Sequence, residues 1–261
     1  MNAVIVNRFK RAIQGGGQAQ IGLWSCLTDP AAAEMLSATG FDWMLLDSEH
    51  SPHDVRTLMA QLQATSGSPT SIVVRPPDGL AVRIKQFLDI GALSLLIPMV
   101  DTPEQAAELA RAVQFPPAGT RGVASQTRAG LWGGIPDYLR RARDEICLIT
   151  QVESRTAVQN VDAIAAVDGI DAIFVGPMDL AASMGYIGNP GAPEVVAAIE
   201  HVAVRVHEAG KPVGILTVDE KQAARYVEHG FDFVAVGMDT MLLRREAAAL
   251  RSRFARKEVN A

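Results

Sequence analysis

Two carboxylates follow neighbouring apolar runs near the middle of the chain. Glu153 lies at the end of EICLITQVES (145–154), and Asp179 ends IDAIFVGPMD (170–179). Oxygen ligands with no histidine or cysteine nearby suit a hard cation that keeps its other positions for water and substrate. The pair therefore predicts a catalytic metal site. The alternative is that each carboxylate pairs with an arginine or caps a helix, and Asp179 precedes a short helical turn.

His50 ends another apolar run, FDWMLLDSEH (41–50), and Asp47 lies three residues before it. A carboxylate beside a histidine can hold one tautomer and make the ring more basic, as a general base near neutral pH requires. The other histidines fall on helical stretches or in the loop beyond this run. We expect His50 to be an acid/base residue, with a structural histidine as the alternative.

Arg75 follows the apolar residues SIVV and precedes two prolines, in the run 71–77. Proline keeps the preceding residue extended, which aims this permanent cation toward the end of the run. Beside a metal, a guanidinium can stabilise an oxygen that gains negative charge during reaction, such as an enolate oxygen. Its alternative role is a salt bridge to Glu49 or Glu153.

The stretch GPMD (176–179) places a turn-forming Gly-Pro pair before a short helical segment. Backbone N–H groups at such a start favour an anion, so a substrate carboxylate could lie there and also chelate the metal. Neither of the last two apolar runs is followed by a glycine-rich phosphate loop. The expected ligand therefore carries a carboxylate and does not require a phosphate.

No lysine lies at the C-terminal end of an apolar run. Lys211 precedes the apolar part of its run, and the other lysines lie on helical or terminal stretches. A Schiff-base aldolase needs a lysine at its active site. That mechanism is disfavoured, and carbonyl activation is left to the metal. The lysines are Lys10, Lys85, Lys211, Lys221 and Lys257.

Eight short apolar runs alternate with longer stretches of helical spacing, and these elements must position the candidate residues. Near-continuous apolar strands between helices indicate parallel strands that are covered on both faces. Eight such units in roughly 250 residues predict an α/β protein with one closed (β/α)8 TIM barrel over residues 1–261. A doubly wound open sheet is the alternative, but it usually carries a glycine-rich loop after an early strand. The runs are 20–27, 41–50, 71–77, 93–100, 145–154, 170–179, 211–218 and 231–239.

The composition excludes several classes of protein. The 261 residues include 24 Lys+Arg against 29 Asp+Glu, a net charge of −5, and 48% are hydrophobic. No basic patch stands out for nucleic acid or anionic membranes, and no uncharged apolar run approaches the roughly 18 residues of a membrane span. Cys26 and Cys147 lie far apart in apolar runs and are expected to be reduced. With no signal-peptide pattern at the N-terminus, we expect a soluble, cytoplasmic protein.

Several ordered motifs resemble the HpcH/HpaI aldolase family, the metal-dependent pyruvate aldolases. This family includes 4-hydroxy-2-oxo-heptane-1,7-dioate aldolase and 2-dehydro-3-deoxyglucarate aldolase. The resemblance extends from about residue 20 to 250 and is specific, because many motifs occur in the same order. The motifs are GFDWMLLDSEHSPHD, VVRPP, LIPMV, FPPAGTRGV, QVESR, FVGPMDLAASMGYIGNP and VAVGMDT.

The resemblance implies roles for individual residues. Glu153 and Asp179 would bind a divalent cation, Mg²⁺, Mn²⁺ or Co²⁺. His50 would be the acid/base residue and Arg75 the group that stabilises the enolate oxygen. The carboxylates that support the histidine would be Asp47 and Asp89. The pyruvate moiety would be bound by Gln151 and by the segment Gly176, Pro177, Met178 and Asp179.

The resemblance also implies an assembly, a homohexamer built as a dimer of trimers with the C-terminal helix exchanged between subunits. The long segment 115–139 would contribute to subunit contacts, whereas by composition alone it could equally be a mobile surface loop. Selectivity for the aldehyde is expected from side chains such as Trp24 and Leu216.

These inferences predict a class II aldolase that cleaves a 4-hydroxy-2-oxo acid to pyruvate and an aldehyde. Substrates of this class include 4-hydroxy-2-oxoheptanedioate and 2-keto-3-deoxy sugar acids, and hydroxypyruvate is a further candidate donor. One alternative is a thioester lyase of the citrate-lyase-β or malyl-CoA type, which would want a basic groove for coenzyme A. The other is a catalytically silent barrel that serves as a binding module.

Overall fold

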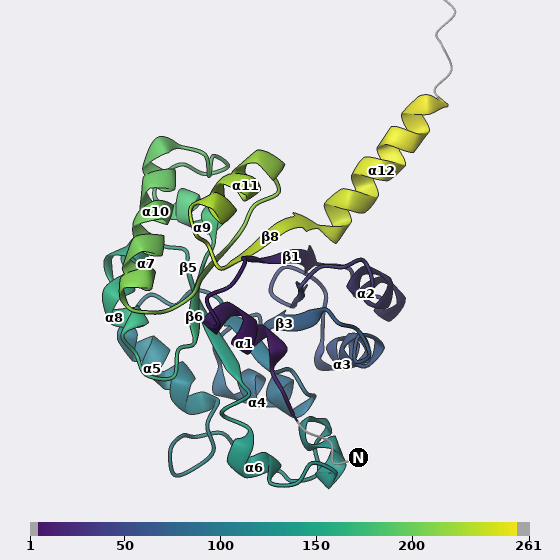
Figure 1. Cartoon of the computed structure of the whole chain (residues 1–261), viewed down its shortest axis with the longest axis vertical. Helices are drawn as coiled ribbons and strands as arrows, with labels where there is room; N and C mark the ends of the chain where they lie inside the picture. Colours follow the sequence, from purple (N-terminus) through teal and green to yellow (C-terminus); the bar gives the residue numbers. More distant parts are fainter. Residues whose placement is uncertain (1–4, 255–261) are drawn as a thin grey trace, which may run out of the picture.

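Eight parallel strands close into one barrel in the computed structural model, which describes residues 5–254 (Figure 1). Each strand hydrogen-bonds to the next, and the last pairs with the first, so the (β/α)8 prediction is confirmed. Lys257 and the end of the expected C-terminal helix lie outside the described residues. The strands are β1 (Gln20–Ser25), β2 (Trp43–Asp47), β3 (Ser71–Arg75), β4 (Ser94–Ile97), β5 (Cys147–Val152), β6 (Ala172–Val175), β7 (Val213–Leu216) and β8 (Phe233–Met238).

The helices lie mainly between the strands, as the spacing predicts. The helical segment between β5 and β6 is divided at Asn160, whose side chain donates a hydrogen bond to the Asp101 carbonyl (2.7 Å). The helices are α1 (Arg8–Gln14), α2 (Pro30–Ser37), α3 (Val55–Ala64), α4 (Ala81–Asp89), α5 (Pro103–Ala112), the 3₁₀ helix η1 (Arg128–Gly133), α6 (Tyr138–Arg141), α7 (Arg155–Gln159), α8 (Val161–Ala165), α9 (Pro177–Ser183), α10 (Pro193–Glu208), α11 (Glu220–Glu228) and α12 (Asp239–Arg253).

Three strands begin with the same Gly-x-Asp device at the N-terminal end of the barrel. In each case the glycine after a helix has positive φ, which only glycine adopts at little cost. The aspartate two residues later accepts a hydrogen bond from the backbone N–H of the preceding strand, which aligns the start of one strand with the next. The aspartates and their donors are Asp42 with Ile21, Asp171 with Leu148 and Asp232 with Val213, each at 2.8 Å, and the glycines are Gly40, Gly169 and Gly230.

Aromatic side chains fill the barrel interior along its axis. Phe9 of α1 packs from the N-terminal end against Trp43 and Phe233, with ring centroids 5.5 and 5.4 Å away. Phe174 continues the column, with centroids 5.8 Å from Phe233 and 5.8 Å from Trp24. The interior is therefore a packed core, and the only region left for chemistry is its C-terminal end.

Helix α12 leaves the barrel instead of covering it (Figure 1, yellow). Asp239 is its one buried residue, and its apolar side chains Leu243, Leu250 and Phe254 are exposed. Among residues 5–254, none of the helices combines the length and apolar character that a membrane crossing needs.

Candidate active site

The register of β2 and β3 places Asp47 directly opposite Arg75 at the C-terminal end of the barrel. Arg75 donates two hydrogen bonds to the carboxylate, from Nε to Oδ1 (2.9 Å) and from Nη2 to Oδ2 (2.7 Å). Both side chains are buried. This two-point pairing fixes the plane of the guanidinium as well as its position.

Asp47 also organises the loop that carries the histidine. Its Oδ1 accepts the backbone N–H groups of Glu49 (3.0 Å) and His50 (3.4 Å). Burial opposes ionisation of Asp47, but the hydrogen bonds and charge of Arg75 outweigh it and hold the pKa of this carboxyl below its usual range. In this part of the structure Asp47 therefore supports His50 through the backbone and makes no hydrogen bond to the imidazole.

Glu49 is a site residue that the sequence analysis considered only as an alternative ion-pair partner. Its Oε2 lies 2.8 Å from Arg75 Nη1 and 3.9 Å from His50 Nε2. The salt bridge proposed as the alternative role of Arg75 is thus present, together with the pair to Asp47. Burial, with the negative charges of Asp47 and Asp179, raises the pKa of Glu49 despite Arg75.

Glu153 is held at both carboxylate oxygens just beyond the end of β5. Oε1 accepts the backbone N–H of Met99 (2.7 Å), and Oε2 accepts a hydrogen bond from the Gln151 amide. A Cβ at position 176 would lie 2.5 Å from Glu153 Oε2, so Gly176 is required for this close approach. Burial, then the charges of Asp179 and Glu49, raise the pKa of Glu153 to about 8.

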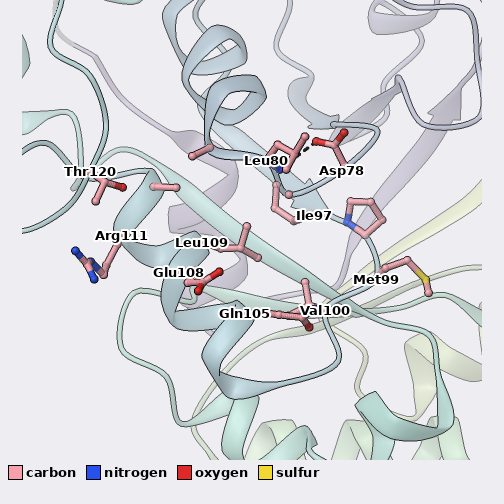
Figure 2. Close-up of a pocket in the computed structure, with 14 residues that line it drawn as sticks. Asp78, Leu80, Ile97, Met99, Val100, Gln105, Glu108, Leu109, Arg111 and Thr120 are labelled. Atoms are coloured by element: carbon pink, nitrogen blue, oxygen red, sulfur yellow. Dashed lines mark hydrogen bonds between the residues drawn. The ribbon is translucent and has the colours of Figure 1, made fainter.

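Met99 has a backbone conformation that few side chains adopt, with φ of 55°. This conformation directs its N–H at Glu153, an example of local strain beside a functional group. Its side chain points outward, where Figure 2 shows it at one end of a pocket of about 460 Å³ between α4 and α5. None of the residues predicted for the site lines that pocket. No residue type or spacing in LIPMV indicated this role for Met99.

Asp179 occupies the first turn of α9, after Gly176 at the N-cap position. Gly176 has no side chain with which to cap the helix, and Asp179 makes no side-chain hydrogen bond or ion pair within residues 5–254. The capping and arginine-pairing alternatives are therefore not observed for Asp179. Its negative charge contributes to the raised pKa of Glu153, so the two carboxylates lie at the same end of the barrel.

Glu153 and Asp179 have the chemistry of a divalent-cation site. Glu153 is buried, and within residues 5–254 neither carboxylate forms an ion pair. Burial and the charge of Asp179 raise the pKa of Glu153, and a bound cation would lower it. Over residues 5–254 no three His, Cys, Asp or Glu side chains form a complete metal cage. Two carboxylates with open positions suit Mg²⁺ or Mn²⁺.

Three other predicted residues lie in different surroundings. Trp24 is only 2% exposed, and its ring lies beneath the Arg75 guanidinium. It therefore contacts the charged pair formed by Arg75 and Asp47 and does not line an open substrate site. Leu216 ends β7 and is partly buried against the interior cluster. Asp89 ends α4 near the opposite end of the barrel, where its Oδ1 accepts a hydrogen bond from Arg121 (2.8 Å). One chain alone does not bring Asp89 to His50.

Comparisons with known proteins agree with this geometry. The family model described as HpcH/HpaI aldolase/citrate lyase matches residues 20–246. A relative from Pseudomonas aeruginosa named hydroxypyruvate/pyruvate aldolase is 53% identical over 95% of this chain and 93% of its own length. A Shigella sonnei protein named 4-hydroxy-2-oxo-heptane-1,7-dioate aldolase is 51% identical over 95% of both chains. The crystal structure of an HpcH/HpaI aldolase/citrate lyase family protein from Burkholderia cenocepacia superimposes with a TM-score of 0.92 at 38% identity, covering 96% of this chain and 100% of the other.

The raised pKa of Glu153 predicts how the stability of the metal-free protein depends on pH. Between pH 4.5 and about 8 the folded protein keeps a proton on Glu153 that the unfolded chain releases. The free energy of unfolding should therefore fall as pH rises through this range. In EDTA, urea denaturation of Glu153→Gln should lack that loss, so its stability relative to wild type increases with pH. The exposed Glu34→Gln is the control, and parallel curves for wild type and Glu153→Gln would contradict the assignment.

Proposed function

Because the chain belongs to the HpcH/HpaI aldolase/citrate lyase family, we propose that it is a divalent-metal-dependent aldolase. It cleaves a 4-hydroxy-2-oxo acid to pyruvate and an aldehyde, or runs the addition in reverse. The names of the relatives from Pseudomonas aeruginosa and Shigella sonnei support this reaction, and the first supports hydroxypyruvate as a second donor. 4-Hydroxy-2-oxoheptanedioate and 2-keto-3-deoxy sugar acids are the substrates to test first.

The observation that carries the proposal is the buried Glu153 near a fixed guanidinium, with Asp179 at the same end of the barrel. Arg75 is held by Asp47 and Glu49, and its charge acts on Glu153. A carboxylate pair for a cation and a rigid cation for a developing negative charge are the two parts that enolate chemistry requires. Mg²⁺, Mn²⁺ and Co²⁺ all suit the pair, and a cation bound there supplies a Lewis acid to the 2-oxo group of the substrate.

The chain's own residues perform the remaining tasks. His50 is exposed at the barrel mouth, where it takes the proton from the 4-hydroxyl group as the C3–C4 bond breaks. Arg75 stabilises the negative charge on the enolate oxygen of pyruvate until C3 is protonated. Gln151 and the backbone of Gly176 to Asp179, with Pro177 and Met178, bind the carboxylate end of the substrate. Within residues 5–254, Gln151 Oε1 is buried without a hydrogen-bond partner, which leaves an acceptor for a donor group of a bound molecule, such as a hydroxyl.

We further propose the homohexamer with exchanged C-terminal helices. Beside β1 and β8 lies a groove of about 1060 Å³ at the position where an eighth helix would cover the barrel. Its apolar residues include Leu23, Phe41, Val227 and Val236. The first turns of α12 form one wall of this groove, and the helix then runs away from the barrel (Figure 1). The α12 of a neighbouring subunit is therefore the occupant of the groove in the proposal.

The assembly also gives Asp89 a role. Because Asp89 lies far from the histidine of its own chain, it supports the His50 of a neighbouring subunit in this proposal, and the segment 115–139 forms part of the same contact. The cytoplasm is the proposed location. It keeps cysteines reduced, and Cys26 and Cys147 are free within the structure, with the pKa of each thiol raised mainly by burial.

Metal removal tests the proposed function directly. Pyruvate release from a 4-hydroxy-2-oxo acid should stop after EDTA treatment and return with Mg²⁺, Mn²⁺ or Co²⁺. Borohydride with substrate should leave the activity intact, since no lysine of residues 5–254 lies at the barrel mouth. Metal-independent turnover trapped by borohydride would show a Schiff-base mechanism. No turnover with any 2-oxo acid would favour the thioester lyase, assayed with an acyl-CoA, or the silent barrel.

Loss of the Arg75 charge should slow the chemical step. Arg75→Ala is expected to lower kcat by about 10²–10³-fold, the range for removing one preorganised donor to an oxyanion. The measurement is steady-state pyruvate release at saturating metal. The control is Arg83→Ala on α4, which removes an exposed ion pair between Arg83 and Asp78. A kcat of Arg75→Ala within a few-fold of wild type would refute the enolate role.

Charge on α12 should break the assembly. Leu243 and Leu250, 62% and 53% exposed in one chain, are seven residues apart and so lie on one face of the helix. Light scattering should show a hexamer for wild type and smaller species for Leu243→Asp/Leu250→Asp. Ile187→Asp, at a site 84% exposed, should remain hexameric. An unchanged mass in the double variant would mean that α12 does not hold the subunits together.

A further inference from the structure

Asp239 is a buried carboxylate with an unusual number of donors, located where β8 passes into α12. Its Oδ2 accepts from Ser25 Oγ (2.7 Å) and from the backbone N–H of Leu27 (2.9 Å). The N–H of Cys26 lies 3.0 Å from both oxygens, and the N–H of Thr240 lies 2.6 Å from Oδ1. No cation pairs with Asp239 within residues 5–254, so neutral donors alone satisfy its charge.

These donors belong to the end of β1, at the point where the barrel closes. The pairing of β1 with β8 shifts register between Gly22 and Trp24, so the regular ladder is interrupted there. The three consecutive residues that follow, Ser25 to Leu27, are instead bound to one side chain. On the β8 side, Asp239 therefore replaces the ladder at the C-terminal end of β1, while Trp24 and Ser25 stay paired with β2 on the other side.

The residue immediately before this tether is Trp24, which touches both members of the charged pair. Its indole Nε1–H donates to Asp47 Oδ2 (3.2 Å). The Arg75 guanidinium carbon lies 4.7 Å from the centre of its ring, within the range of a cation–π contact. A shift in the end of β1 would move this ring from beneath the guanidinium.

We infer that Asp239 is a positioning residue for catalysis, which acts through Trp24 on the orientation of Arg75 and Asp47. This inference rests on the proposed function, because it concerns the residue assigned to the enolate. The carboxylate is needed for its two acceptor oxygens. An asparagine would present an NH₂ group to N–H donors on one side and leave buried N–H groups without partners.

The kinetic signature follows from what Arg75 contacts. The enolate charge exists only during the reaction, so a misplaced guanidinium lowers kcat and leaves the KM for the 2-oxo acid nearly unchanged. A displacement of about 1 Å in a catalytic group can cost on the order of 100-fold in rate. For Asp239→Asn we therefore expect kcat to fall about 10- to 100-fold, with KM within about threefold of wild type.

Two further variants separate positioning from stability. Asp42→Asn is the matched control, because Asp42 tethers the other end of the same strand through the N–H of Ile21, far from the charged pair. It should lower the melting temperature and keep wild-type kcat. Ser25→Ala removes one donor to Asp239 and leaves the carboxylate and α12 in place. It should lower kcat several-fold, and it serves if Asp239→Asn does not fold.

The route through Trp24 is tested by a double-mutant cycle measured on the full chain with saturating Mn²⁺. If Asp239 acts through Trp24, Asp239→Asn should cost clearly less in the Trp24→Phe background than in wild type. Fully multiplicative losses in the cycle would overturn the inference. So would a wild-type kcat in both Asp239→Asn and Ser25→Ala.

The mass of the assembly, measured on the same samples, shows whether a loss of kcat comes from dissociation of the subunits. A loss of kcat in Asp239→Asn at wild-type mass supports the inference. A loss found only with dissociation, while Ser25→Ala keeps wild-type kcat, overturns it in favour of a role in assembly. Absence of aldolase activity in the wild-type protein itself contradicts the proposed function instead, so the two failures are distinguishable.

Discussion

The buried ion pair between Arg75 and Asp47 is the interaction on which the catalytic end of the barrel depends. Either group alone would be costly in this apolar interior, so each makes the burial of the other tolerable. The pair is possible because β2 and β3 are in register at these two residues. Asp47 also fixes the loop that follows β2, because it accepts hydrogen bonds from the backbone N–H groups of Glu49 and His50. The Asp47 carboxylate thus fixes the Arg75 guanidinium, which is expected to stabilise an enolate, and also the backbone of His50, the expected acid/base residue.

The ion pair in turn rests on the aromatic core. Trp24 lies under the guanidinium, Phe174 lies beside Trp24, and the column continues through Phe233 to Phe9 at the other end of the barrel. Such a column needs backbone without side chains next to it. A Cβ at Gly214 would lie 2.2 Å from the Phe233 ring, so even this small addition would disturb the packing. Close packing of rigid rings is a means of holding a catalytic group in one orientation, since rings have few rotamers to exchange.

Much of this arrangement could be predicted from the sequence, and the exceptions share a physical cause. Parallel strands buried on both faces read as continuous apolar runs, so all eight were recognisable, and Glu153 and Arg75 were recognisable because they end such runs. The strained backbone of Met99 and the buried position of Trp24 were not predicted, and only the family resemblance implied that the C-terminal helix leaves its own barrel. Each depends on contacts between distant parts of the chain. Asp89 shows the same limit, because a residue that is proposed to act on another subunit has no local pattern to mark it.

The charges at the barrel mouth explain why a cation and a negatively charged substrate belong to the same site. Asp47 and Glu49 pair with Arg75, Glu153 and Asp179 add two further carboxyl groups at the same end of the barrel, and burial raises the pKa of Glu49 and Glu153. This excess of negative charge would repel a 2-oxo acid, whose carboxylate must approach the same point. A divalent cation held by Glu153 and Asp179, as proposed, would reverse that repulsion, lower the pKa of Glu153 and offer the substrate a positive partner. The arrangement is therefore unfavourable to substrate without metal and favourable with it, so binding of the 2-oxo acid should follow binding of the cation.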